Sequence, residues 1–241
     1  MHKLLKRFVP EKKEIHRGPK IRVSSLLYGD GAELLVLPLI PTALVQAGDR
    51  ATSIEFAAAT VLDRVGLAAL VKRHQPRRIF EIGTFRGVTA LTMAANAPAQ
   101  SVLYTLDLPP EMSAAEIANE HYTGNSKSGF HKLAGSNAAR DVGRLLATHK
   151  GPGSIKQLFG DSTKFDFTCF ENEIDLFFVD GCHTYANALT DTRTAWRCAR
   201  AGGVVVWHDY PWPDVQRAVA DANLSEVTAV ADTNLAYAIK A

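Results

Sequence analysis

The sequence of 241 residues has few cysteines and no long apolar run. Its three cysteines, Cys169, Cys182 and Cys198, form no Cys-x-x-Cys pair and leave one residue over. This pattern is typical of a reducing compartment rather than of a disulfide framework, so we expect a cytoplasmic protein. The apolar stretch 34–45 is too short to span a bilayer and contains two prolines, so we expect no membrane span.

An excess of charge of one sign is also missing. The formal net charge is +2, which is too small to indicate a nucleic-acid partner. Basic residues are frequent only near the N-terminus, where no convincing apolar periodicity occurs. We therefore expect residues 1–51 to form a basic N-terminal extension that packs on the main domain or on another subunit of a homo-oligomer.

Two phosphate-binding motifs are absent as well. The sequence contains no Gly-Lys-Ser/Thr, which excludes a P-loop. In the stretch Glu81–Gly87 the second glycine comes four residues after Gly83, whereas a dinucleotide fingerprint needs Gly-x-Gly-x-x-Gly. Glycines here would still let a cofactor approach the backbone. The Glu81 carboxylate suits an ammonium group better than a pyrophosphate. An NAD(P)-dependent oxidoreductase is thus the disfavoured alternative.

What the sequence does contain, from residue 52 onwards, is an alternation of helical and strand-like apolar segments. A helix that begins near Thr52 and ends before Pro76 comes first. The predicted strands are 78–83, 101–107, 155–159, 174–180, 203–208, 226–231 and 235–240. The predicted helices between them are 87–96, one near 135–148, 184–200 and 213–223.

This order predicts an α/β fold, a Rossmann-like doubly wound sheet with helices on both faces. The sheet should have seven strands, mostly parallel. The turn 232–234 is too short for a crossover, so the last two strands should form an antiparallel hairpin. We expect one domain, 52–241. Within it, 108–150 is too long for a simple connection and is either a lid or a surface insertion.

Polar residues follow the ends of the predicted parallel strands, where ligands bind in such sheets. Asp107 ends one strand and is suited to accept the hydroxyls of a ribose. Asp161 and Ser162 follow the next strand and could address an adenine edge, although Asp161 could instead cap a helix. Further along the chain, Asp180 with His183 and His208 with Asp209 end two more strands.

Together these motifs resemble the class I S-adenosylmethionine-dependent methyltransferases. The resemblance runs from about residue 52 to the end and is greatest to the bacterial cephalosporin-biosynthesis and macrolide-sugar O-methyltransferases. The motifs that carry it are Glu81–Gly87, Leu158–Ser162, Val179–Tyr185, Ala201–Gly203 and Trp207–Asp209. We accordingly expect S-adenosylmethionine to be bound by Glu81, Gly83, Thr84, Phe85, Gly87, Asp107, Asp161, Ser162 and Asp180.

The resemblance also implies a metal and a base. It maps a divalent ion, Mg²⁺ or Mn²⁺, onto Asp180, His208 and Asp209, and a general base onto His183. Position 208 departs from the family, in which an acid is usual. A histidine there favours Mn²⁺, Fe²⁺ or Zn²⁺ over Mg²⁺, or acts as a second base without a metal. Trp207 is a candidate for the wall of a substrate pocket, as is Trp212.

The expected function is O-methylation of a hydroxyl on a small molecule such as a sugar or a secondary metabolite, with catalysis by His183 and Asp180. Besides the oxidoreductase, a non-catalytic S-adenosylmethionine-binding scaffold remains as an alternative. The sequence does not identify the methyl acceptor.

Overall fold

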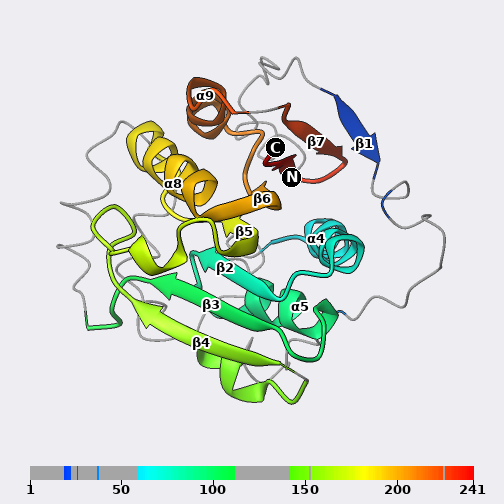
Figure 1. Cartoon of the computed structure of the whole chain (residues 1–241), viewed down its shortest axis with the longest axis vertical. Coiled ribbons are helices and arrows are strands. Elements are labelled where there is room, and N and C mark those ends of the chain that lie inside the picture. The colour runs from blue at the N-terminus through cyan, green and yellow to red at the C-terminus, as the bar shows by residue number, and fades with distance from the viewer. Residues whose placement is uncertain are drawn as a thin grey trace, which may run out of the picture.

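Figure 1 shows the computed structural model, in which one twisted sheet carries helices on both sides. The structure describes residues 19–22, 26, 37, 59–111, 142–151, 153–224 and 226–241. The strands are β1 (Lys20–Arg22), β2 (Arg78–Ile82), β3 (Val102–Asp107), β4 (Ser154–Phe159), β5 (Ile174–Val179), β6 (Ala199–Trp207), β7 (Thr228–Ala231) and β8 (Ala236–Ile239). The helices are α4 (Val61–His74), α5 (Val88–Asn96), α8 (Tyr185–Cys198) and α9 (Pro213–Asp221), with short 3-10 helices η2 (Arg144–Thr148) and η3 (Thr168–Phe170).

The strand order confirms the predicted doubly wound α/β fold. The sheet runs β1-β7-β8-β6-β5-β2-β3-β4. β8 is antiparallel to both β6 and β7, as the short turn predicted, and the other pairs are parallel. The sheet has eight strands rather than the predicted seven, because β1 from the N-terminal extension pairs in parallel with β7. Part of the extension thus completes an edge of the sheet.

The apolar core is divided by the sheet into two layers. On one face α8 and α9 contribute Ala188, Ala195 and Val219 to a cluster with Phe80 of β2 and Phe177 of β5. On the other face α4 and α5 contribute residues such as Leu70 and Met93. In Figure 1 these two helix pairs lie on opposite sides of the strands. Within the described ranges, no helix is both long and apolar enough to cross a bilayer.

Three predicted elements differ from the structure by more than two residues or extend beyond its described part. α4 begins at Val61, and the predicted start near Thr52 lies outside the described residues. Of the predicted helix 135–148, the described part forms η2, while most of the insertion 108–150 is not described. β6 begins at Ala199, earlier than predicted, because Ala199 is extended and pairs with Ile174 of β5.

At Gly83 the ends of β2 and β5 lie close together. Gly83 has φ 97°, and a Cβ there would lie 2.0 Å from the carbonyl oxygen of Asp180. Only glycine fits such a contact without moving backbone. The loop after β2 and the loop after β5 therefore touch each other.

We expect Gly83→Ala to lower the free energy of unfolding by more than about 3 kcal/mol, since it combines backbone strain with a clash against backbone. The matched control is Gly202→Ala. Gly202 also has positive φ, 72°, but a Cβ there would meet only an Arg200 side-chain nitrogen at 3.5 Å. This control should cost about 1 kcal/mol. Urea denaturation of both variants measures the difference, and equal costs would contradict the close contact.

Candidate active site

The loop Gly83–Gly87 between β2 and α5 is held by the end of β3. The Phe85 backbone N–H donates to Asp107 Oδ2 at 2.7 Å, and the Leu108 N–H donates to Oδ1 at 2.7 Å. Burial raises the pKa of Asp107, and these backbone hydrogen bonds offset part of the effect. Asp107 thus fixes the glycine loop, and its two oxygens together offer more acceptor positions than the backbone N–H groups of Phe85, Leu108 and Thr84 use.

Glu81 lies beneath this loop and is completely buried. The Thr89 hydroxyl donates to Oε1 at 2.6 Å, the Thr105 hydroxyl donates to Oε2, and the Thr84 hydroxyl lies 2.6 Å from that of Thr105. Burial raises the pKa of Glu81 to about 8, although both threonine hydrogen bonds act against the shift. In this structure Glu81 therefore supports the loop from inside, rather than presenting its carboxylate at a surface.

The residues after β4 form a tight turn. Asp161 Oδ1 accepts from the backbone N–H of Thr163 at 2.9 Å and from its hydroxyl at 2.7 Å. Asp161 therefore caps a turn, close to the alternative considered from the sequence. Ser162 neighbours Asp191 of α8, a buried acid that the sequence analysis did not single out. Burial raises the pKa of Asp191 to about 7, offset in part by the Ser162 hydroxyl.

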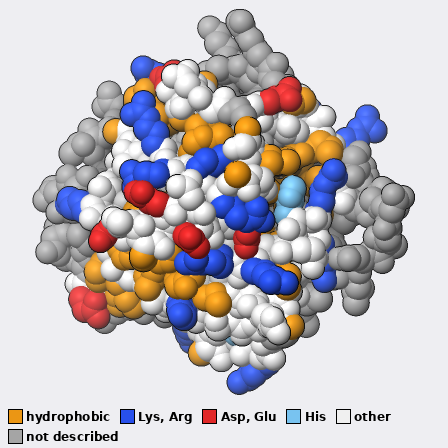
Figure 2. Space-filling view, viewed as in Figure 1, with side chains coloured by type: hydrophobic (Ala, Val, Ile, Leu, Met, Phe, Trp, Pro, Cys, Tyr) orange, Lys and Arg blue, Asp and Glu red, His pale blue; other side chains and the backbone are white. Residues whose placement is uncertain are grey.

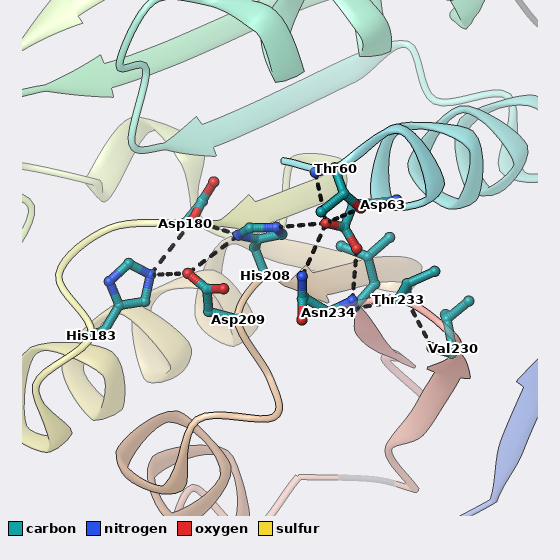
Figure 3. Close-up of polar contacts among 10 residues, drawn as sticks. Thr60, Asp63, Asp180, His183, His208, Asp209, Val230, Thr233 and Asn234 are labelled. Carbon is teal, nitrogen blue, oxygen red and sulfur yellow. Dashed lines mark hydrogen bonds and ion pairs between the residues drawn. The ribbon is translucent and has the colours of Figure 1, made fainter. Parts of the chain in front are cut away.

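Four predicted residues meet beyond β5 and β6, as Figure 3 shows. His183 Nε2 forms an ion pair with Asp209 Oδ2 at 2.9 Å and lies 3.7 Å from Asp180 Oδ1. Three possible ligand atoms lie within 4.8 Å of one another, one each from Asp180, His183 and Asp209. They are close enough to share a metal ion. The structure thus adds His183 to the residues that could hold a metal. We call Asp180, His183, His208 and Asp209 the acid–base cluster.

His208 lies deepest in the cluster. Its Nδ1 is 3.1 Å from Asp180 Oδ1 and 3.5 Å from Asp209 Oδ2, while its Nε2 is 3.3 Å from Asp63 Oδ2. Both ring nitrogens therefore face carboxylates, and the side chain is nearly inaccessible to solvent. Asp63 belongs to α4, and Figure 3 shows it on the far side of the imidazole from Asp180.

The carboxylates determine the charge of the two imidazoles. Burial alone would lower the pKa of His183, but Asp180 and Asp209 raise it to about 9. The same balance raises the pKa of His208 well above its ordinary value. In return, the two histidines hold the pKa of Asp209 below its usual range despite burial. Without a further cation, both imidazoles are therefore protonated at neutral pH.

The sequence analysis missed Asp63, which has a recognisable local signal. Thr60 caps α4, and Asp63 completes a reciprocal capping box three residues later. The pattern Thr-x-x-Asp could have identified this helix start. It would not have revealed the contact with His208, because the two residues are 145 positions apart.

The two candidate tryptophans have different places. Trp207 is buried in the core, where its indole N–H donates to the Thr192 hydroxyl at 3.1 Å. It cannot line an open pocket. Trp212 is 40% exposed, and its ring centroid lies 5.2 Å from that of His183. Of this pair, Trp212 flanks the acid–base cluster.

On the face seen in Figure 2, basic side chains of the described residues are interspersed with acidic and apolar ones. This view accords with the small net charge.

Comparison with known proteins identifies the family. Residues 80–210, more than half of the chain, match the model described as "Methyltransferase domain". No curated protein matches the sequence significantly. Among solved structures, the chain is similar to SAH-bound PaMTH1 of Podospora anserina (TM-score 0.53, 14% identity, 78% of this chain and 81% of that chain covered).

Two further structures are similar. Cofactor-bound Rv0187 from MTB has a TM-score of 0.50 and 19% identity, with 82% of this chain and 94% of that chain covered. The O-methyltransferase TomG from Streptomyces achromogenes, in complex with SAM, has a TM-score of 0.48 and 19% identity, with 77% and 82% covered. By the family model and the fold, this chain belongs to the class I S-adenosylmethionine-dependent methyltransferases.

Proposed function

We propose that this methyltransferase transfers the methyl group of S-adenosylmethionine to a hydroxyl oxygen of a small molecule, such as a sugar or a secondary metabolite. In this proposal His183 is the general base. Asp180 and Asp209 hold a divalent cation beside it.

One observation supports this proposal above the others: the glycine loop and the acid–base cluster are in contact. The carbonyl oxygen of Asp180 abuts Gly83, and the Asp180 backbone N–H donates to the carbonyl of Ile82 at 2.9 Å. A cofactor that lies along the loop would therefore present its reactive end beside His183. The proposed cofactor loop and the acid–base cluster thus lie at the same edge of the sheet, as expected where parallel strands end.

The cofactor contacts follow from the hydrogen bonds of this rim. Asp107 is proposed to accept the ribose hydroxyls with its remaining acceptor positions, next to the Thr84–Phe85 backbone. Ser162 and Asp161 lie after the neighbouring strand and would address the adenine edge. Glu81 acts on the cofactor indirectly, through the threonines that shape the loop.

The donor set fits a divalent cation. Asp180 and Asp209 offer oxygen donors within 4.8 Å of each other, which suit a divalent cation, and the His208 imidazole beside them favours Mn²⁺, Fe²⁺ or Zn²⁺ over Mg²⁺. When bound, such a cation would lower the pKa of an acceptor hydroxyl and orient its oxygen. Asp180 and Asp209 would hold it, since an oxygen of each lies near the same nitrogen, His183 Nε2.

The acceptor oxygen then attacks the methyl carbon, the bond from carbon to sulfur breaks, and the sulfonium becomes a neutral thioether. The hydroxyl proton goes to His183 Nε2. For this role His183 must first lose its own proton. Asp180 and Asp209 stabilise that proton on the imidazole, because they raise the pKa of His183 to about 9. A cation bound by these carboxylates would weaken that stabilisation and so lower the pKa of His183. Metal binding would therefore favour the neutral form that can act as a base.

The function is tested by titrating ligand-free protein with S-adenosylhomocysteine in a calorimeter, followed by a screen of hydroxylated acceptors with methyl-labelled S-adenosylmethionine. We expect micromolar binding and label transfer to oxygen. Binding without transfer to any acceptor would favour the scaffold, and no binding would overturn the proposed function.

For an acceptor found in that screen, His183→Ala should lower turnover by about 10²–10⁴-fold, because the proton then has no positioned acceptor. The affinity for S-adenosylhomocysteine should change little. Steady-state kinetics and calorimetry measure the two effects. Turnover like that of the wild type would refute the base assignment.

The pKa of His183 should fall when a cation binds. Without metal, histidine NMR should report a value near 9, because two carboxylates stabilise the protonated ring. Saturation with diamagnetic Zn²⁺ or Mg²⁺ should lower it, since those charges are then neutralised. In Asp209→Asn the metal-free pKa should already be lower, and added metal should have little effect. An unchanged pKa in the wild type would remove the metal from the site.

Glu81→Gln should stabilise the protein increasingly as pH rises from 5 to 8. The folded-state pKa of about 8 lies above the ordinary glutamate value of 4.5, so the folded state binds the proton more tightly. Wild-type stability therefore decreases as pH rises between these two values, whereas the neutral glutamine has no such cost. Thermal unfolding at several pH values measures the difference in stability between the variant and the wild type. A difference that does not depend on pH would mean that Glu81 is ionised throughout this range.

A further inference from the structure

We propose that Asp63 is a positioning residue of the acid–base cluster. By binding His208 Nε2 it directs Nδ1 towards Asp180 and Asp209 and so keeps these two carboxylates at the spacing that a shared cation requires. This inference rests on the proposed function, in which Asp180 and Asp209 hold the cation.

The contacts of Asp63 exceed what a helix cap needs. Its Oδ2 accepts from the Thr60 backbone N–H at 2.8 Å and from the Thr60 hydroxyl at 2.7 Å, which completes the capping box. In addition, the Asn234 backbone N–H donates to Oδ1 at 2.6 Å, and its side-chain amide donates to Oδ2 at 3.2 Å. His208 Nε2 is the fifth donor, at 3.3 Å.

These contacts join three parts of the fold at one carboxylate. The start of α4, the β7–β8 turn and the end of β6 all meet at Asp63, which is only 1% exposed (Figure 3). A carboxylate with so many donors has little freedom to move. It is therefore a rigid support for the imidazole that lies against it.

His208 needs such a support. Its backbone is fixed by the hydrogen bond from its N–H to the Val179 carbonyl at 3.0 Å, but its side chain can still rotate. On the cluster side a single nitrogen, Nδ1, faces both Asp180 and Asp209. The contact of Nε2 with Asp63 lies on the other side of the ring and favours the orientation in which Nδ1 faces the cluster. A histidine whose second nitrogen meets a carboxylate is oriented in this way at many metal sites.

The oriented imidazole of His208 in turn determines the positions of the Asp180 and Asp209 carboxylates. Asp180 and Asp209 carry like charges and would repel each other if nothing positive lay between them. His208 Nδ1 lies within 3.5 Å of both, so its N–H sets where the two oxygens sit before a cation arrives. Loss of Asp63 should therefore loosen the cluster without changing any residue that contacts the cofactor.

The experiment compares Asp63→Asn with a matched control, Thr60→Val. The control removes the capping hydroxyl at the same helix start but leaves the carboxylate against His208. Both variants should lose thermal stability. Only Asp63→Asn should weaken Mn²⁺ binding, measured by calorimetry, by about 10–100-fold. Affinity for S-adenosylhomocysteine should be unchanged in both.

A second readout is independent of the metal. Imidazole ¹H–¹⁵N correlations, with His208 assigned by comparison with His208→Gln, should change in Asp63→Asn and stay as in the wild type in Thr60→Val. Wild-type His208 signals in Asp63→Asn, or equal changes in both variants, would overturn the proposal. If the wild type binds no Mn²⁺, the metal part of the proposed function fails, and the His208 signals alone decide the role of Asp63.

Discussion

The parallel register of β5 and β6 is the constraint on which the site depends. Val179 pairs with Trp207, so the next residues of the two strands, Asp180 and His208, emerge side by side. The hydrogen bond from the His208 N–H to the Val179 carbonyl extends the ladder by one step. A shift of one residue in β6 would turn His208 to the opposite face of the sheet, away from Asp180. The chemistry is therefore positioned by backbone pairing before any side chain makes a contact.

Burial then decides how these side chains must be charged. Ionised groups with little access to water are costly unless they are paired. Here each imidazole lies between carboxylates, which raise both histidine pKa values, while the imidazoles lower that of Asp209. Protons on the imidazole nitrogens thus balance the charges of the cluster. In the proposed function, a cation bound by the same oxygens would compete with those protons.

The histidine at position 208 lies between carboxylates that come from different elements. An acid there would face Asp63 across a buried contact and add a further negative charge. The imidazole instead fills the space between Asp63 and the carboxylates of the rim. The imidazole thus compensates the buried carboxylate of Asp63.

The sequence by itself determined the class of fold, the antiparallel C-terminal hairpin and the polar residues at each strand end. These follow from apolar periodicity, turn length and motif spacing, which are local. The tertiary structure decided what depends on how separate elements dock: the pairing of β1 with β7, the burial of Glu81, the exposure of Trp212 and the contact between Asp63 and His208. Periodicity reports which face of an element is buried. It carries no information about which side chain of a distant element lies opposite, because register and helix docking are settled only when the whole core packs.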